Sequence, residues 1–401
     1  MKKSMDIQNV NSLNVRLNIV SGNLLPMTAD DSSFPIFWKV YSILVWLLEI
    51  VQMFVLTYGC FHVPKEKALK DGLIGIVVTI EVVFLVVQIH ARKELVQQLI
   101  EKLNDILHID DEIMRNIVMD TIKSKEILFK FYWTAGVMSI IIWSSVPFTL
   151  VFQKSDFFYV DYRMPVVFSK EPFTSIIFML GSFVVMTSSM YIFTKKVSVD
   201  SYMMNLILLM TAQYKYIALK LSMIFQDKIS QMNYNSANQK HYSKNYYVEK
   251  QMKSLCQHHN MVIHISFLLR KLLSLNFSLI YIISVFRFCC IAIMMISIPS
   301  TTLLETFVII MYACGGVVQL YILCSCVQQL LDASIEITDQ TFHEKWYKFG
   351  ASIKQMFVFL IMANNLDLKL STFEKYNLSL ASFMVILNQS YSIALLLLKT
   401  N

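Results

Sequence analysis

Seven long apolar runs divide the 401-residue chain. A helix needs roughly 20 residues to cross the roughly 30 Å hydrocarbon core of a bilayer. The long runs do not alternate between apolar and polar residues, as the strands of a membrane β-barrel would. Because 56% of the residues are hydrophobic and only 16% are charged, we expect an all-α integral membrane protein. Its seven transmembrane helices are predicted at residues 36–61, 73–89, 131–152, 175–193, 273–297, 303–327 and 373–398.

The charges of the connecting segments predict which way the chain crosses the membrane. If the N-terminus is cytoplasmic, the inner segments hold 25 Lys and Arg residues and the outer ones 7. Positive residues concentrate on the cytoplasmic side of membrane proteins. We therefore expect a cytoplasmic N-terminus and an extracellular C-terminus. This topology is opposite to that of a G-protein-coupled receptor, whose Asp-Arg-Tyr and Asn-Pro-x-x-Tyr signatures are also absent from the sequence.

The connections are of very unequal length. Apolar residues at helical spacing follow the fourth span, at Met203, Leu206, Ile207, Met210 and Ile217. They favour a packed cytoplasmic anchor bundle over helices lying on the lipid surface, because the dense basic face of a surface helix is missing. The predicted parts are a cytoplasmic N-terminal segment (1–34), helices one to four (35–193), cytoplasmic extensions (194–272) with a flexible loop (226–247), helices five and six (273–327), anchor helices (328–372) and a last helix (373–401).

The sequence offers no catalytic constellation. Cys256, His258, His259 and His264 form the one cluster of metal-binding residue types, and no second cluster supplies the remaining ligands. Nucleophile-elbow, zinc-protease and phosphate-loop motifs are absent. We therefore expect neither an enzyme nor a protein with a metal site, a cofactor or a nucleic-acid partner.

A few polar and aromatic residues inside the apolar runs are candidates for function. Glu49, Glu81 and Arg287 lie well inside predicted spans, where ionisable groups are costly and usually face a partner or a water cavity. One hypothesis is that Arg287 pairs with Glu49 or Glu81. Gly136, Ser139 and Trp143 share one face of the third helix, which fits either a helix-packing notch or an apolar ligand pocket with one hydroxyl group.

The C-terminal third resembles the insect odorant receptor family. The similarity rests on the order and spacing of Gln319-Leu320-Tyr321 with Cys324, Trp346-Tyr347, Tyr376-Asn377-Leu378-Ser379-Leu380 followed by Ser382-Phe383, and Ser390-Tyr391-Ser392. The chain departs from the family at Met362-Ala363-Asn364-Asn365, where many members have an Arg-Ser-Gln-Pro-like stretch. It also lacks the long second inner loop of the coreceptor, so it resembles a ligand-tuning subunit.

This resemblance implies a ligand-gated, non-selective cation channel in the plasma membrane of olfactory sensory neuron dendrites. The chain would form a heterotetramer with coreceptor subunits, and the last helix would line the pore. A gustatory-type receptor channel of the same superfamily is the alternative. The gate would lie at Ala394, Leu397 and Leu398. The odorant pocket would be lined by Leu73, Ile76, Val77, Gly136, Ser139, Trp143, Phe178, Thr306, Ile309 and Tyr312.

The expected ligand is a volatile and largely apolar molecule. Ser139 and Thr306 each offer one hydrogen bond, which suits an ester, an alcohol or a carbonyl compound. No charged side chain is expected in this lining, so an ionic ligand is disfavoured.

Overall fold

The computed structural model describes residues 6–28, 34–108, 111–167, 170–232, 238–297, 303–343, 346–364 and 378–399. Seven of its helices are long and apolar enough to cross a membrane, which confirms the predicted number of spans. These seven are α3 (Ile36–Cys60), α5 (Leu73–Ala91), α7 (Glu112–Leu150), α8 (Ser175–Met232), α9 (Asn238–Ser297), α10 (Leu303–His343) and α12 (Leu380–Lys399).

Shorter helices connect or flank the spans. They are α1 (Ile7–Val10), α2 (Ser12–Val20), α4 (Lys65–Lys67), α6 (Lys93–Leu107) and α11 (Ala351–Asn364). The π-helical turn Ala68–Gly72 leads into α5, and two 3₁₀ turns cover Tyr159–Asp161 and Trp346–Lys348. The one strand-like pairing in the described part of the chain is an antiparallel bridge between Phe157 and Phe173.

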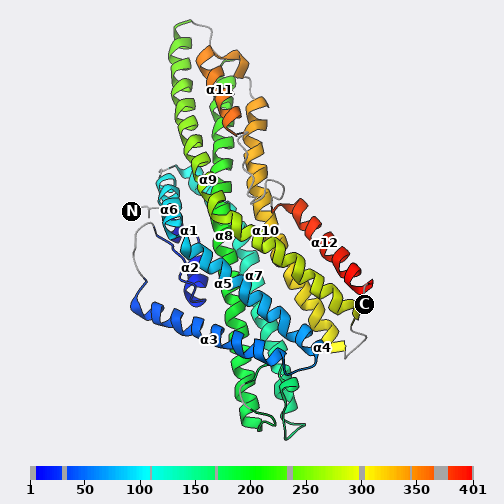
Figure 1. Ribbon diagram of the computed structural model, residues 1–401. Helices are drawn as coiled ribbons and strands as arrows, with labels where there is room; N and C mark the ends of the chain where they lie inside the picture. The colour runs from blue at the N-terminus through cyan, green and yellow to red at the C-terminus, as the bar shows by residue number, and fades with distance from the viewer. Residues whose placement is uncertain are drawn as a thin grey trace.

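Two helices extend far beyond a bilayer. α8 has 58 residues and α9 has 60, so at 1.5 Å per residue each is about 90 Å long, roughly three times the hydrocarbon thickness. Figure 1 shows them rising side by side with α11 and the end of α10 packed against them. We call this part of the molecule the anchor end. The opposite end, which carries the connection between α7 and α8 (residues 151–174), is the loop end.

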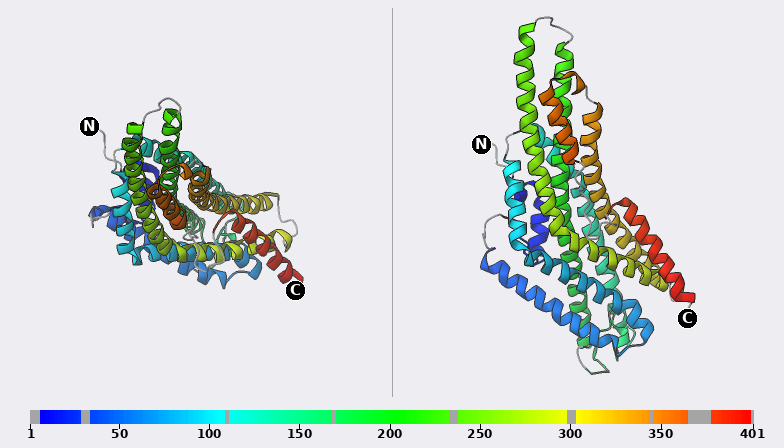
Figure 2. Two further views of the ribbon diagram at one scale, coloured as in Figure 1. Left: turned by 90° about the horizontal axis from the view of Figure 1, so that it is seen from above. Right: turned by 45° about the horizontal axis from the view of Figure 1, so that its top comes forward.

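α8 is the central helix of the structure. It packs most extensively against α7 and α10, and it also contacts α2, α3, α5 and α9. Between residues 194 and 218 nearly every side chain is buried. The predicted stripe is confirmed as buried, since Met203, Leu206, Ile207, Met210 and Ile217 are at most 1% exposed. α12 lies at one edge of the bundle, against α9 and α10 (Figure 2).

The N-terminal segment folds into the body of the protein. α1 and α2 lie beside α8 and α6, and Ile7, Leu17 and Leu25 are buried. Asparagine side chains complete the contact: Asn11 Nδ2 donates to Asn205 Oδ1 at 3.1 Å. This segment was expected only as a polar cytoplasmic stretch.

Some of the predicted loop and helix boundaries fall at or beyond the limits of the described residues. α8 ends at Met232 and α9 begins at Asn238, so helices take up most of the segment 226–247 for which composition predicted a flexible loop. Residues 233–237, the connection 298–302 and the predicted start of the last helix at 373–377 lie outside the described residues. The described part of that helix begins at Leu380.

Candidate functional site

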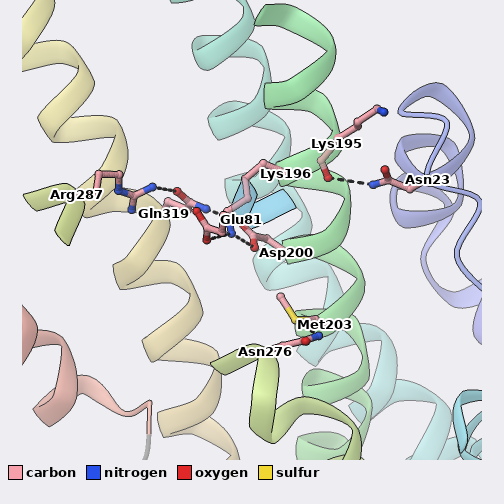
Figure 3. Close-up of polar contacts among 9 residues, drawn as sticks. All are labelled: Asn23, Glu81, Lys195, Lys196, Asp200, Met203, Asn276, Arg287 and Gln319. Atoms are coloured by element: carbon pink, nitrogen blue, oxygen red, sulfur yellow. Dashed lines mark hydrogen bonds and ion pairs between the residues drawn. The ribbon is translucent and has the colours of Figure 1, made fainter. Parts of the chain in front are cut away.

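A buried polar network joins four spans near the middle of α8 (Figure 3). Lys196 Nζ lies 2.8 Å from Glu81 Oε1 on α5 and 2.7 Å from Asp200 Oδ1, one turn further along α8. Gln319 Nε2, on α10, donates to Asp200 Oδ2 at 2.5 Å. Arg287 Nη1, on α9, donates to Gln319 Oε1 at 3.1 Å. The network therefore ties α5, α8, α9 and α10 together through side-chain contacts.

The charges of this network balance. Lys196 and Arg287 supply two cations, Glu81 and Asp200 supply two anions, and each of the four is at most 7% exposed. Burying an ion is expensive unless it is paired and hydrogen-bonded. The expected partner of Arg287 was Glu49 or Glu81, but the structure gives it Gln319 and pairs Glu81 with Lys196. Sequence reasoning placed Lys196 at the membrane boundary and so missed it as a partner.

The neighbouring Lys195 extends in another direction. Its Nζ lies 3.3 Å from the centroid of the Trp46 ring on α3, a cation–π contact. Its carbonyl oxygen accepts a hydrogen bond of 3.0 Å from Asn23 Nδ2 (Figure 3). Glu49 accepts from Ser188 Oγ at 3.3 Å. Two adjacent lysines thus connect α8 to the N-terminal segment and α3 on one side, and to α5 on the other.

The three candidate residues of α7 have different surroundings. A Cβ at Gly136 would lie 2.1 Å from Phe193 Cζ, so this glycine leaves room for a phenyl ring of α8. Ser139 Oγ donates to the carbonyl oxygen of Ala135 at 2.8 Å. Trp143 is half-buried, and the guanidinium carbon of Arg163 lies 5.2 Å from its ring centroid. Gly136 therefore has the geometry of a packing notch, and Trp143 faces the α7–α8 connection.

The candidate residues of α5 and α8 lie close to that same connection. Leu73, Ile76 and Val77 are half-buried, and Ile76 packs against an apolar cluster at the loop end. Phe178 belongs to this cluster and is fully buried. Its ring stacks on Phe157 with 4.2 Å between centroids.

Tyr162 completes the aromatic group. Its ring centroid is 4.9 Å from that of Phe178, and burial raises the pKa of its hydroxyl to about 12. The α7–α8 connection therefore packs against the helices at the predicted pocket rather than extending away from them.

The candidate pocket residues on α10 differ in how far they are buried. Thr306 is exposed, and Ile309 and Tyr312 are half-buried. The Tyr312 hydroxyl is buried and has no hydrogen-bond partner among the described residues, and it lies within electrostatic range of Arg287 and Glu81. Tyr312 packs against the large core cluster and not against the apolar cluster at the loop end.

One face of α12 packs inside the subunit. Ser382, Ile386, Ser390 and Ala394 are buried at four-residue intervals. Ala394 is fully buried, whereas Leu397 is 46% exposed and Leu398 is half-buried. A side chain that is covered within its own subunit does not also line an open channel. Of the three expected gate residues, Leu397 and Leu398 therefore have the surface that a gate requires.

Comparisons with known proteins identify the family. A family model described as 7tm Odorant receptor matches residues 72–391. The chain belongs to the odorant receptor family. A comparison of the sequence with curated proteins gives no match. Members of the odorant receptor family are receptors rather than enzymes, and no group of three or more metal-binding side chains occurs among the described residues.

Solved structures share the odorant receptor fold. The insect olfactory receptor OR5 from Machilis hrabei superposes with a TM-score of 0.75 at 14% identity, over 99% of this chain and 100% of that one. The same receptor in complex with eugenol gives a TM-score of 0.68 at 12% identity, over 98% and 100% of the two chains. The TM-scores establish a common fold, and at identities this low the likeness extends to the fold alone.

Proposed function

We propose that this odorant receptor is the ligand-binding subunit of an odorant-gated, non-selective cation channel. It assembles with coreceptor subunits, as a tetramer, in the plasma membrane of olfactory sensory neuron dendrites. The observation that carries the proposal is the outward face of α12. Asn388, Gln389 and Ser392 are exposed halfway along this membrane-spanning helix. Gln389 Oε1 accepts from the Tyr281 hydroxyl at 2.8 Å, and Ser392 Oγ donates to the Asn388 carbonyl oxygen at 2.9 Å, but all three side chains keep exposed surface. Exposed polar side chains at that depth are costly in lipid, so this face suits a water-filled pore or a neighbouring subunit.

The charge distribution supports one orientation. The anchor end carries the long Lys- and Arg-rich segments and would face the cytoplasm, and the loop end would face the odorant-containing fluid. In this orientation the C-terminal end of α12, with Leu397 and Leu398, forms an outer hydrophobic gate. Apolar gates close by excluding water from a narrow constriction.

The ligand is proposed to be a volatile, largely apolar molecule. Its site is the loop-end half of the bundle, between α5, α7, α8 and α10, where the expected pocket residues lie. Eugenol, the compound in the complex of the Machilis receptor, is a small aromatic molecule of this class. The buried Tyr312 hydroxyl, which has no hydrogen-bond partner among the described residues, is a further polar group that a ligand oxygen could reach.

The proposal is tested by recording odour-evoked currents from cells that express this chain with a coreceptor, the coreceptor alone, or the chain alone. We expect a panel of volatiles to evoke cation currents only from the first combination. Epitopes at the two ends test the orientation: intact cells should stain at the C-terminus, and the N-terminus should stain only after permeabilisation. Currents from this chain alone would favour a gustatory-type channel, and a reversed staining pattern would overturn the assignment of the pore.

A further inference from the structure

The connection between α7 and α8 inserts part of its length into the helix bundle. Pro165 and Val166 are buried, and a Cβ at Gly59 would lie 2.1 Å from the carbonyl oxygen of Pro165. Met164 lies against Gly75 of α5, where an added Cβ would be 3.4 Å from its Cε. We call residues 162–166 the inserted segment. It occupies the region of α5, α7 and α8 where the odorant site is proposed.

Arg163 is the charged residue of the inserted segment. Its guanidinium lies over the Trp143 ring, 5.2 Å from the centroid. Its Nε is buried and has no hydrogen-bond partner among the described residues. A cation–π contact engages the guanidinium against the face of the indole and leaves its N–H groups free to donate.

A second unpartnered polar atom lies nearby on α8. Phe178, Ser182 and Ser189 share one face of that helix, at spacings of four and seven residues. Phe178 contacts Tyr162, and Ser189 Oγ lies 3.9 Å from Met164 Sδ. Ser182 therefore lies between two contacts of the inserted segment, and its buried hydroxyl has no partner among the described residues.

A guanidinium stays protonated in a protein, so Arg163 cannot lower the cost of burial by losing its proton. A buried N–H without an acceptor is unfavourable, and a ligand oxygen that fills this position removes the cost. We propose that Arg163 is a specificity-determining residue that selects odorants carrying a carbonyl or carboxylate oxygen. The apolar remainder of such a ligand packs on the Trp143 indole, and Ser182 offers a second hydrogen bond.

This inference rests on the proposed function and specifies the ligand class at the same site. It replaces the expectation that no charged side chain lies in the lining. Arg163 lies in the connection between α7 and α8, outside the apolar runs from which the lining was predicted, and the fold brings it over Trp143. Ser139, which was expected to bind the polar group, already donates its hydroxyl proton to Ala135.

The test uses the full complex with its coreceptor and matched sets of straight-chain volatiles: alkane, aldehyde and carboxylic acid of equal carbon number, such as heptane, heptanal and heptanoic acid. In the wild type we expect aldehydes or acids to activate at lower concentrations than the alkanes. Arg163→Met should raise the half-maximal concentrations of the oxygen-bearing ligands by about tenfold or more relative to the alkane, the size expected for one lost charge-assisted hydrogen bond. If the site recognises the positive charge alone, Arg163→Lys should retain most of the response to the oxygen-bearing ligands. If it recognises the planar guanidinium, Arg163→Lys should lose that response.

The matched control is Lys170→Gln, which removes an exposed positive charge from the same connection. It should leave all ratios unchanged. A coreceptor agonist applied to each variant reports surface channels independently of this site. Equal effects of Arg163→Met on aldehyde and acid indicate recognition of a neutral acceptor, and a larger effect on the acid indicates selection of the anion.

Two results overturn the inference while leaving the proposed function intact: a wild-type response confined to alkanes, or unchanged ratios in Arg163→Met channels that respond normally to the coreceptor agonist. Failure of the proposed function looks different, since no volatile would then evoke a current that depends on this chain. If Arg163→Met does not reach the surface, ligand-dependent shifts in the melting temperature of purified wild-type and Arg163→Lys complexes provide the same comparison.

Discussion

Lys196 of α8 and Glu81 of α5 hold their charged atoms 2.8 Å apart, with side chains only 4% and 3% exposed. Asp200, Gln319 and Arg287 extend this contact across α8, α10 and α9. A buried polar network with balanced charges in a membrane-spanning bundle fixes the relative register of its helices, because displacement of any one helix breaks an ion pair or a buried hydrogen bond.

We therefore expect Glu81→Ala to lower the free energy of unfolding of the subunit by about 3 kcal/mol, at the low end for a broken buried pair because Asp200 remains beside Lys196. Thermal unfolding of the purified complex measures the effect. The control is Glu66→Ala, which removes an exposed carboxylate from α4. The double variant Glu81→Ala/Lys196→Met should lose less stability than the sum of the single variants, and strict additivity would show that the pair does not interact.

Trp143→Ala should weaken odorant activation. Loss of the indole removes apolar contact area from the proposed site and releases Arg163, so we expect half-maximal concentrations to rise by about tenfold. The relative permeability to cations should stay the same, because the pocket and the gate are separate sites. Ile142→Ala is the control, since the neighbouring side chain is 64% exposed on the outside of α7. An unaltered odour response in a normally expressed Trp143→Ala complex would reduce this residue to a packing role.

The last turns of α12 predict a contrast between the exposed or half-buried Leu397 and Leu398 and the buried Ala394. Leu397→Ala and Leu398→Ala should raise the basal current, because smaller side chains weaken a gate that closes by excluding water. Ala394→Leu should instead destabilise the subunit by about 1–3 kcal/mol, since it forces three extra carbons into a fully packed position. Current recordings and surface labelling of the same cells separate the two effects. A raised basal current in Ala394→Leu channels with normal surface labelling would place that residue at the gate.

The contacts of Asp111, which lies outside the membrane-spanning segments, predict a pH dependence of the free energy of unfolding. Burial acts to raise its pKa, but hydrogen bonds from Lys220 Nζ at 2.8 Å, Tyr216 Oη at 2.8 Å and the Ile113 N–H at 2.9 Å outweigh burial and lower it. A carboxylate with a lowered pKa stabilises the fold above its ordinary value of 3.8 and loses that contribution as the pH falls through its folded-state pKa.

The stability difference between the wild type and Asp111→Asn should therefore be constant from about pH 8 to about pH 5 and shrink in stronger acid. Melting temperatures recorded across this range give the comparison. A difference that is already lost near neutral pH would show that the Lys220 contact does not lower this pKa.

The spans and the buried stripe of α8 could be predicted because they depend on local periodicity. An apolar run of sufficient length is a helix in a membrane whatever its neighbours are, and the helical spacing of Met203, Leu206 and Met210 predicts one buried face. The burial of α8 on all sides between residues 194 and 218 was beyond sequence reasoning. It requires partners for polar side chains, and Asn11 and Asn205, for example, are separated by 194 positions along the chain.

Asn364 illustrates the same limit. The sequence marks it only as part of a departure from the family pattern, yet its Nδ2 donates to the Ser334 carbonyl oxygen at 2.7 Å and to Thr338 Oγ1 at 2.8 Å. Its Oδ1 lies 3.3 Å from His259 Nε2. A side chain that joins three helices of the anchor end carries no local signal of that role.

The ligand site stays a prediction, and the sequence pointed to helices for it and not to the α7–α8 connection. Spacing and resemblance predicted Trp143 and Phe178 as pocket residues, and both contact the α7–α8 connection at the loop end. The inserted segment has no periodicity, and its place in the bundle depends on the space left by Gly59, where a Cβ would lie 2.1 Å from the Pro165 carbonyl oxygen. Its arginine was therefore counted only as a loop charge.

The unbroken length of α8 has a mechanical consequence. The same helix carries Phe178 near one end and extends to Met232 in the anchor end, so a small tilt at the proposed odorant site would move the far end through a larger arc. The packing of residues 194–218 on all sides resists such a tilt. If an odorant opens the proposed channel, we therefore expect α8 to stay in place and the helices with an exposed face to move, above all α12 at the edge of the bundle.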